Sequence, residues 1–116
     1  EDMARLVVYA LQNDVFRQAF TSRSYTMAST AFHPGGFTVT STLFASLSDP
    51  SVPGGEILGG KTGYTEEAGL CLASLAVVNG KEYVLVTAGA PGDHQSEPYH
   101  VQDAVKVYGR IGENPE

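Results

Sequence analysis

The longest apolar segment of the chain covers residues 70–78, where every side chain except that of Ser74 is hydrophobic. Such a run predicts a central strand that is covered on both faces of a sheet. It ends at Asn79-Gly80, a pair typical of a two-residue β-turn because both turn positions need a positive φ. Strand-forming residues return over 81–88, so the pattern predicts an antiparallel hairpin. The expected register pairs Val78 with Lys81, Ala76 with Tyr83, and Ser74 with Leu85.

Residues 57–64 predict a further strand before this hairpin, which gives an antiparallel meander of at least three strands. Helical spacing appears at both ends of the chain. Residues 2–14 predict an amphipathic helix, and residues 15–20 a short further turn of helix. Near the other end, Ser96 is expected to cap a closing helix that Gly112 ends. The apolar face of the closing helix would consist of Val101, Ala104, Val105, Tyr108 and Ile111.

The connection between the first helix and the meander is rich in Ser, Thr and Gly over residues 21–42. Residues 23–27 and 37–40 predict two short strands, and residues 49–55 predict a loop. The last strand of the meander, residues 81–88, would present an unpaired apolar edge. Such edges recruit partners, so we expect this one to be covered by either short strand or by another chain.

The length of 116 residues allows one domain. We expect an α/β-type layering of the α+β kind, in which the antiparallel sheet is flanked by an N-terminal helix and a C-terminal helix. Residues 1–56 would form the first helix and an irregular connection, and residues 57–112 the meander and its closing helix. The net charge of −6 and the scattered basic residues exclude nucleic acid as a partner. No apolar run approaches the ~18 residues of a membrane span.

Candidate chemistry concentrates in residues 59–65, which read Gly-Gly-Lys-Thr-Gly-Tyr-Thr. A lysine between glycines and beside two hydroxyls is suited to holding an anion or a carboxylate. Residues 55–62 also fit the phosphate-binding pattern G-x-x-x-x-G-K-[ST]. That pattern needs a buried strand before it and a helix after it, whereas turn residues precede it here and Gly63, Thr65 and Gly69 follow. Nucleotide binding is therefore the weaker hypothesis.

The same stretch, followed by Ala68-Gly69-Leu70, resembles the Lys-Thr-Gly region of penicillin-binding serine peptidases, and most closely that of low-molecular-mass D-alanyl-D-alanine carboxypeptidases. The resemblance implies a partial transpeptidase-like fold and an enzyme that trims peptidoglycan stem peptides through an acyl-serine intermediate. It further implies β-lactams as inhibitors, no cofactor, no metal, and an exported parent protein at the outer face of the bacterial cytoplasmic membrane, in the periplasm or in the cell wall.

The resemblance also implies roles for individual residues. Lys61 would place positive charge beside the serine of the family's Ser-x-Asn motif and help to move its proton. The Tyr64 backbone N–H would contribute to the oxyanion hole. The hydroxyls of Thr62 and Thr65 would meet the terminal carboxylate of the substrate, and Gly63 would keep the strand edge bare. The peptide stem would pair with this edge as an added strand.

Two further motifs of the family, Ser-x-x-Lys and Ser-x-Asn, are absent. Leu58, Val78 and Asp103 stand three residues before the lysines, and Leu11, Val77 and Gly112 stand two residues before the asparagines. The sequence also begins at Glu1-Asp2 within a helical pattern and without a signal peptide, a pattern expected of a piece excised from a longer protein. We therefore expect a single piece of the catalytic domain, inactive alone, whose partner is the missing N-terminal half or a second copy. The non-enzymatic alternative is a peptide-binding module that uses the same strand edge.

Two other sets of residues carry weaker signals. Cys71 lies in the apolar run and is expected to be a small core residue. Asp93, His94, Glu97 and His100 could approach one another, but their spacing matches no metal-binding signature. We expect them to be solvated loop residues.

Overall fold

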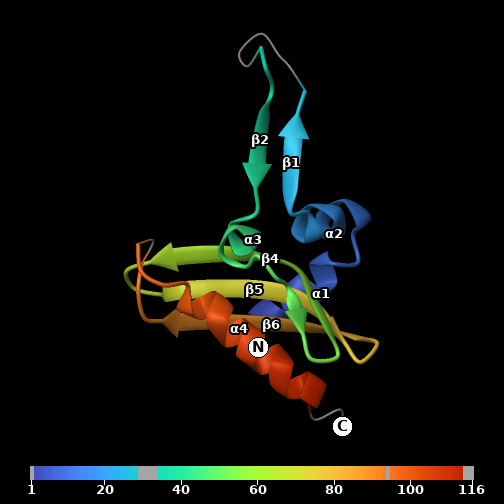
Figure 1. Cartoon of the computed structure of the whole chain (residues 1–116), viewed down its shortest axis with the longest axis vertical. Helices are drawn as coiled ribbons and strands as arrows, with labels where there is room; N and C mark the ends of the chain where they lie inside the picture. The colour runs from blue at the N-terminus through green and yellow to red at the C-terminus, as the bar shows by residue number, and fades with distance from the viewer. Residues whose placement is uncertain (1, 29–33, 94, 114–116) are drawn as a thin grey trace.

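The computed structural model describes residues 2–28, 34–93 and 95–113. The first half of the chain forms short helices and short strands, and the second half forms most of a sheet and a long helix (Figure 1). In chain order the elements are α1 (Asp2–Ala10), α2 (Asp14–Thr21), β1 (Ser24–Met27), β2 (Phe37–Thr40), α3 (Thr42–Ser46), β3 (Ser51–Val52), β4 (Gly55–Thr65), β5 (Gly69–Val78), β6 (Lys81–Ala90) and α4 (Tyr99–Glu113). This is the predicted α+β architecture.

The main sheet has four antiparallel strands in the order β3-β4-β5-β6. The meander β4-β5-β6 is confirmed, whereas β3 lies where the sequence predicted a loop. It pairs only with Gly55 and Glu56, because Gly54 turns the chain back with a φ of 83°. No other strand in the described part of the chain pairs with the outer edge of β4.

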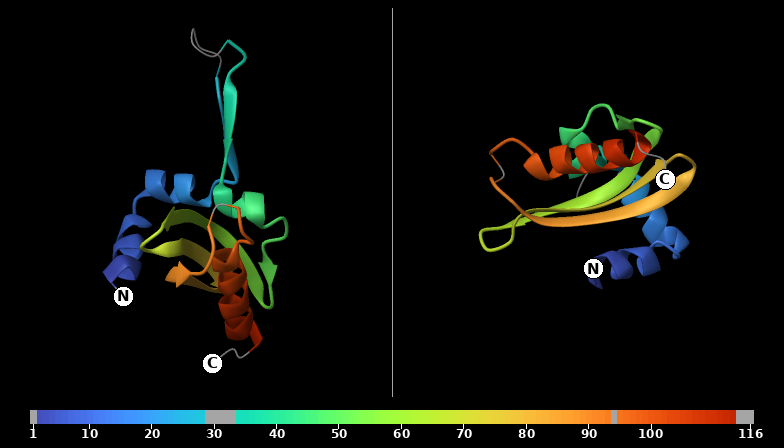
Figure 2. Two further views of the ribbon diagram at one scale, coloured as in Figure 1. Left: turned by 90° about the vertical axis from the view of Figure 1, so that its left-hand side faces the viewer. Right: turned by 90° about the horizontal axis from the view of Figure 1, so that it is seen from below.

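Helices cover both faces of the sheet (Figure 2). On one face, α3 and α4 pack on β4 and β5, and the core there contains Leu43, Ile57, Leu72, Val101 and Tyr108. On the other face, α1 and α2 build a smaller core from Val7, Leu11, Phe20 and Leu75. The strand β5 therefore serves both cores, as its continuous apolar run predicted.

The hairpin β5–β6 has the turn and the register that the sequence predicted. Asn79 takes a φ of 53° and Gly80 a φ of 80°. This is the left-handed conformation that a two-residue turn demands. Val78 faces Lys81, Ala76 faces Tyr83, and Ser74 faces Leu85. A turn of fixed length leaves no freedom in this register.

The closing helix α4 begins at Tyr99, so the prediction that Ser96 is its cap is wrong. The Asp93 carboxylate accepts hydrogen bonds from the backbone N–H groups of Gln95 (2.8 Å) and Ser96 (3.0 Å), which places Ser96 in a preceding turn. Gly112 does not end the helix either, since it lies inside α4. A Cβ at Gly112 would lie 1.6 Å from the Pro53 carbonyl oxygen. The role of this glycine is therefore to let α4 approach that loop.

Two helices form at the N-terminus as predicted, but the first ends at Ala10, earlier than the predicted residue 14. Asn13 caps α2, because its side chain accepts a hydrogen bond from the Phe16 N–H at 3.0 Å. The second helix then runs to Thr21, longer than the single turn expected from residues 15–20.

The two predicted short strands exist, but they pair with each other. In β1 and β2, Ser24 lies opposite Thr40 and Met27 opposite Phe37, and the resulting arm points away from the sheet (Figures 1 and 2). The prediction that one of them covers the last strand of the meander is therefore wrong. Among the described residues, no strand pairs with the outer edge of β6.

Candidate functional site

The Lys-Thr-Gly triplet lies within β4, where Lys61 is paired with Ala73, Thr62 with Leu72 and Gly63 with Cys71. The nucleotide-binding hypothesis requires a helix that starts at this lysine. Since the strand continues to Thr65, that hypothesis is wrong.

A β-bulge just before the triplet decides which face each site residue occupies. Ile57 pairs with Ala76 and the next pair is Gly59 with Leu75, so Leu58 is an extra residue. Leu58 packs in the core of α1 and α2, while Ile57 lies in the core of α3 and α4. The bulge thus reverses the alternation, and Thr62 joins the face of α3 and α4 while Lys61 shares the other face with Ala73.

Three glycines along this strand differ in what surrounds them. A Cβ on Gly59 would lie 2.1 Å from the Phe20 carbonyl oxygen, and one on Gly60 would lie 2.7 Å from the Ala73 carbonyl oxygen. These two glycines let α2 and the neighbouring strand approach β4 closely. At Gly63 an added Cβ would meet nothing within 4 Å. No packing within the described chain requires glycine there, and the space beside it is open.

A groove of about 430 Å³ lies between α3, β4 and the segment that leads into α4. Lys61, Thr62, Gly63 and Tyr64 line it, together with residues such as Thr42, Ser46, Asp93 and His100. The hydroxyls of Thr42 and Thr62 form a hydrogen bond, which ties α3 to the strand. The Lys61 ammonium donates to the Thr62 carbonyl at 2.5 Å and keeps its charge beside the groove.

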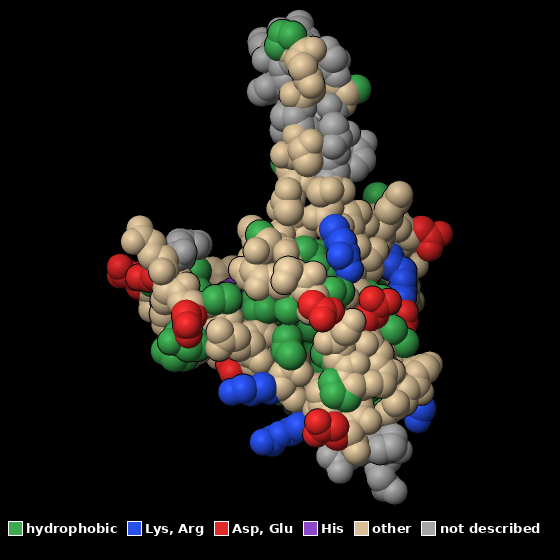
Figure 3. All heavy atoms as spheres, viewed as in Figure 1, with side chains coloured by type: hydrophobic (Ala, Val, Ile, Leu, Met, Phe, Trp, Pro, Cys, Tyr) green, Lys and Arg blue, Asp and Glu red, His purple; other side chains and the backbone are tan. Residues whose placement is uncertain are grey.

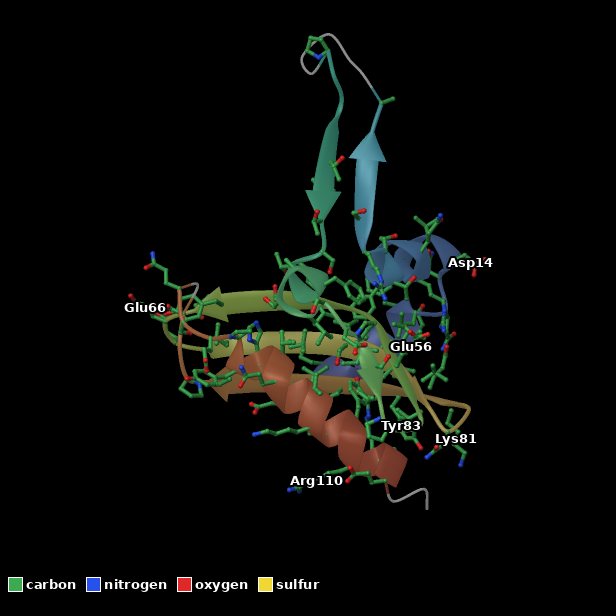
Figure 4. The ribbon with its side chains drawn as sticks, in the orientation of Figure 1. Asp14, Glu56, Glu66, Lys81, Tyr83 and Arg110 are labelled. Carbon is green, nitrogen blue, oxygen red and sulfur yellow. The ribbon has the colours of Figure 1, made fainter. Side chains whose placement is uncertain are left out.

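Thr65 is the one predicted site residue that the groove does not include. Its hydroxyl accepts a hydrogen bond from the Ala68 N–H at 3.0 Å, which fixes the turn between β4 and β5. That turn carries Glu66 and Glu67, and Figure 4 shows Glu66 at the end of the sheet opposite to Lys81 and Tyr83. Acidic side chains are visible at the same end in Figure 3.

A second, larger cavity of about 650 Å³ lies at the base of the arm. Val15 and Ala19 of α2, Val39 and Thr40 of β2, and Lys61 are among its lining residues. Lys61 therefore stands where the two hollows meet.

His100 contradicts the prediction of a solvated loop residue. It lies in the first turn of α4 with only 7% of its surface exposed, and it lines the groove beside the Lys-Thr-Gly strand. Burial lowers the pKa of its imidazole, and the charge of Asp103 opposes that shift. The sequence did contain a signal for this burial. His100, Ala104 and Tyr108 follow one another at a spacing of four residues, as on one face of a helix, and all three are buried.

The structure also bears on the other residues that gave weak signals in the sequence, Cys71 and the possible metal ligands. Cys71 is half-buried, and its thiol lies 3.6 Å from the carbonyl oxygens of Ala68 and Gly69. His94 lies outside the described residues. Within the described ranges, no three His, Cys, Asp or Glu side chains are grouped as metal ligands would be. No helix there is long and apolar enough to cross a membrane.

Comparison with solved structures finds a relative of this architecture. The chain is similar in fold to a D-alanyl-D-alanine carboxypeptidase. That protein, from Mycobacterium tuberculosis H37Rv, superposes with a TM-score of 0.61 at 24% sequence identity, over 93% of this chain and 38% of its own. The chain thus spans well under half of the carboxypeptidase it resembles. No family model matches the sequence, and no curated protein matches it either.

Proposed function

We propose that this chain forms the Lys-Thr-Gly part of a serine-type D-alanyl-D-alanine carboxypeptidase and binds the end of a peptidoglycan stem peptide along β4. The observation that carries the proposal is a Lys-Thr-Gly strand at the open edge of a sheet whose fold resembles part of such an enzyme. The open space beside Gly63 leaves room for an incoming backbone.

The groove supports distinct roles for three of the residues that it brings together, Lys61, Thr62 and Tyr64. Lys61 supplies positive charge where the groove and the second cavity meet, and this charge is suited to moving the proton of the Ser-x-Asn serine. The Thr62 hydroxyl faces the groove and, with Thr42, can hold the terminal carboxylate of the substrate. The backbone N–H of Tyr64 is the proposed donor to the oxyanion. Thr65 would act through the turn that it fixes.

The remaining parts of the enzyme would come from outside this chain. The acylating serine and its lysine base belong to motifs that this sequence lacks. Exposed apolar side chains on α1 and α2, among them Leu6, Tyr9 and Val15, fit a surface that packs against the rest of a catalytic domain. The parent protein would be exported to the cell envelope, where its substrate lies.

The test uses the protein encoded by the complete gene. A Lys61→Ala variant is expected to lose about 100-fold or more in the rate of acylation by a labelled β-lactam, because a positioned proton-transfer group is worth at least that much. Lys106→Ala is the matched control, since Lys106 is exposed on α4 and does not line the groove. Equal rates for the two variants would refute the proposed role of Lys61.

The 116-residue chain by itself is expected to form no covalent adduct with labelled penicillin. A stable adduct would show that the nucleophile is inside the chain. The same open strand edge also fits a non-catalytic peptide-binding module. That alternative gains support if the gene encodes no Ser-x-x-Lys sequence before residue 1.

A further inference from the structure

We propose that His100 is a substrate-contacting residue of the groove, where its Nε2–H donates a hydrogen bond to a carbonyl or carboxylate oxygen of a peptide lying along β4. The inference rests on the proposed function, because it names a further contact in the same site.

The imidazole of His100 is enclosed on one side. Its Nδ1 is buried and has no hydrogen-bond partner among the described residues, and only 7% of the surface of the residue is exposed. A buried polar atom without a partner costs free energy, so such atoms are rare in native proteins. Since Nδ1 is enclosed and the residue lines the groove, we assign the ligand contact to Nε2.

The buried position also selects the state of the ring. Desolvation favours the neutral form, against the nearby charge of Asp103. A neutral imidazole carries one N–H. Buried N–H groups without acceptors are rarer than buried acceptors without donors, so the bare nitrogen should be Nδ1 and the proton should be on Nε2. The ring then offers the groove a donor.

The other groups around the groove fit an acceptor-rich ligand. Lys61 is a donor, and the hydroxyls of Thr42, Thr62 and Ser46 can donate. The one carboxylate of the groove, that of Asp93, already accepts two backbone N–H groups. A peptide carbonyl or a terminal carboxylate satisfies donors of this kind.

Two substitutions separate a ligand contact from a packing role. His100→Gln keeps an N–H donor near the position of Nε2, whereas His100→Phe keeps a ring of similar size and removes the donor. With a peptide that ends in D-Ala-D-Ala, we expect His100→Phe to bind about threefold to tenfold more weakly than the wild-type chain, the range for one lost hydrogen bond. His100→Gln should stay within about twofold. Equal losses in both variants would indicate packing and overturn the proposal.

Nuclear magnetic resonance of the wild-type chain gives a second measurement, which does not depend on whether the variants fold. We expect the ¹⁵N shifts of His100 to show the Nε2–H tautomer at pH 7 and to move when the peptide is added. A protonated Nδ1, or an imidazole that stays still while the amides of Lys61 and Thr62 move, would overturn the inference and leave the proposed function standing. If neither the amides nor the imidazole responds to millimolar peptide, the peptide site in this chain is refuted, and the role of His100 with it.

Discussion

At the scale of single residues, the glycines of the strand that carries the candidate site have different surroundings, and so a side chain would have different effects at each of them. Gly59 and Gly60 stand where backbone from other elements comes too close for a side chain. Gly63 stands beside open space. The fold therefore requires glycine at the first two positions, whereas the space beside the third is available to a ligand.

This difference predicts opposite outcomes for two similar substitutions. Gly59→Ala should lower the free energy of unfolding by about 1–3 kcal/mol, because its Cβ would press on the backbone at Phe20 and Thr21. Gly63→Ala should change the free energy of unfolding by about 0.5 kcal/mol at most, because an added Cβ there would meet no neighbouring atom. Urea unfolding of the two variants measures both. A Gly63→Ala variant as unstable as Gly59→Ala would contradict the open space beside the site.

Tyr108 offers a second test at this scale. Its hydroxyl is hydrogen-bonded to the Ser74 hydroxyl at 2.8 Å in the core between α4 and the sheet. Burial raises the pKa of Tyr108 above its ordinary value, and the hydrogen bond with Ser74 opposes that shift. The neutral phenol is therefore favoured in the folded state. Its contribution to stability is complete below the unfolded pKa of about 10 and is lost as the pH rises through the folded value.

We expect the free energy of unfolding of the wild-type chain to fall above about pH 10 and that of Tyr108→Phe to fall less steeply over the same range. At pH 7 the variant should be less stable by about 1 kcal/mol, because the buried hydrogen bond is lost. Denaturant unfolding at several pH values checks both statements. Parallel pH profiles for the two proteins would show that ionisation of Tyr108 does not cause the loss of stability at alkaline pH.

At the scale of elements, sequence reasoning succeeded where structure is decided locally. The hairpin β5–β6 follows from Asn79-Gly80 and from the apolar run before it, and both were predicted with the correct register. The predicted start of α4 was wrong because the Asp93 carboxylate accepts a hydrogen bond from the Ser96 N–H. This bond places Ser96 in a turn, and the helix begins three residues later, at Tyr99. Capping competes among neighbouring polar residues, and composition does not say which of them prevails.

Pairing between distant segments was harder to predict. The bulge at Leu58 depends on how β4 meets β5, and the adjacent pair Gly59-Gly60 was its only local signal. The strands β1 and β2 were recognised individually, but their partners were not, because short strands of Ser and Thr fit several neighbours. The burial of His100 was missed because its neighbours at helical spacing were assigned to the helix and His100 to the loop.

The arm formed by β1 and β2 gives a prediction at the same scale. A two-stranded ribbon that packs on no sheet is marginally stable in water. We therefore expect the backbone amides of Ser24–Met27 to exchange with solvent much faster than those of β5, which is the central strand of the main sheet. Hydrogen exchange followed by mass spectrometry measures the difference. Equal protection in the two segments would mean that a partner covers the arm.

At the scale of the whole molecule, the sheet ends in two different edges. One is the open part of β4, which carries the candidate site and is bordered by the groove. The other is β6, ten residues long and without a strand partner in the described part of the chain beyond β5. A long bare edge of this kind is a template for pairing with another chain.

The isolated chain should therefore associate through β6 as its concentration rises. Ala88 is exposed on this strand, so Ala88→Lys should weaken association, because a lysine on an edge strand opposes pairing with a second strand. Gln102→Lys adds the same charge on the exposed side of α4 and should associate like the wild-type chain. Sedimentation velocity over a hundredfold range of concentration compares the three proteins. If the wild-type chain remains a monomer throughout, the prediction that β6 pairs with another chain is refuted, while the site on β4 is unaffected.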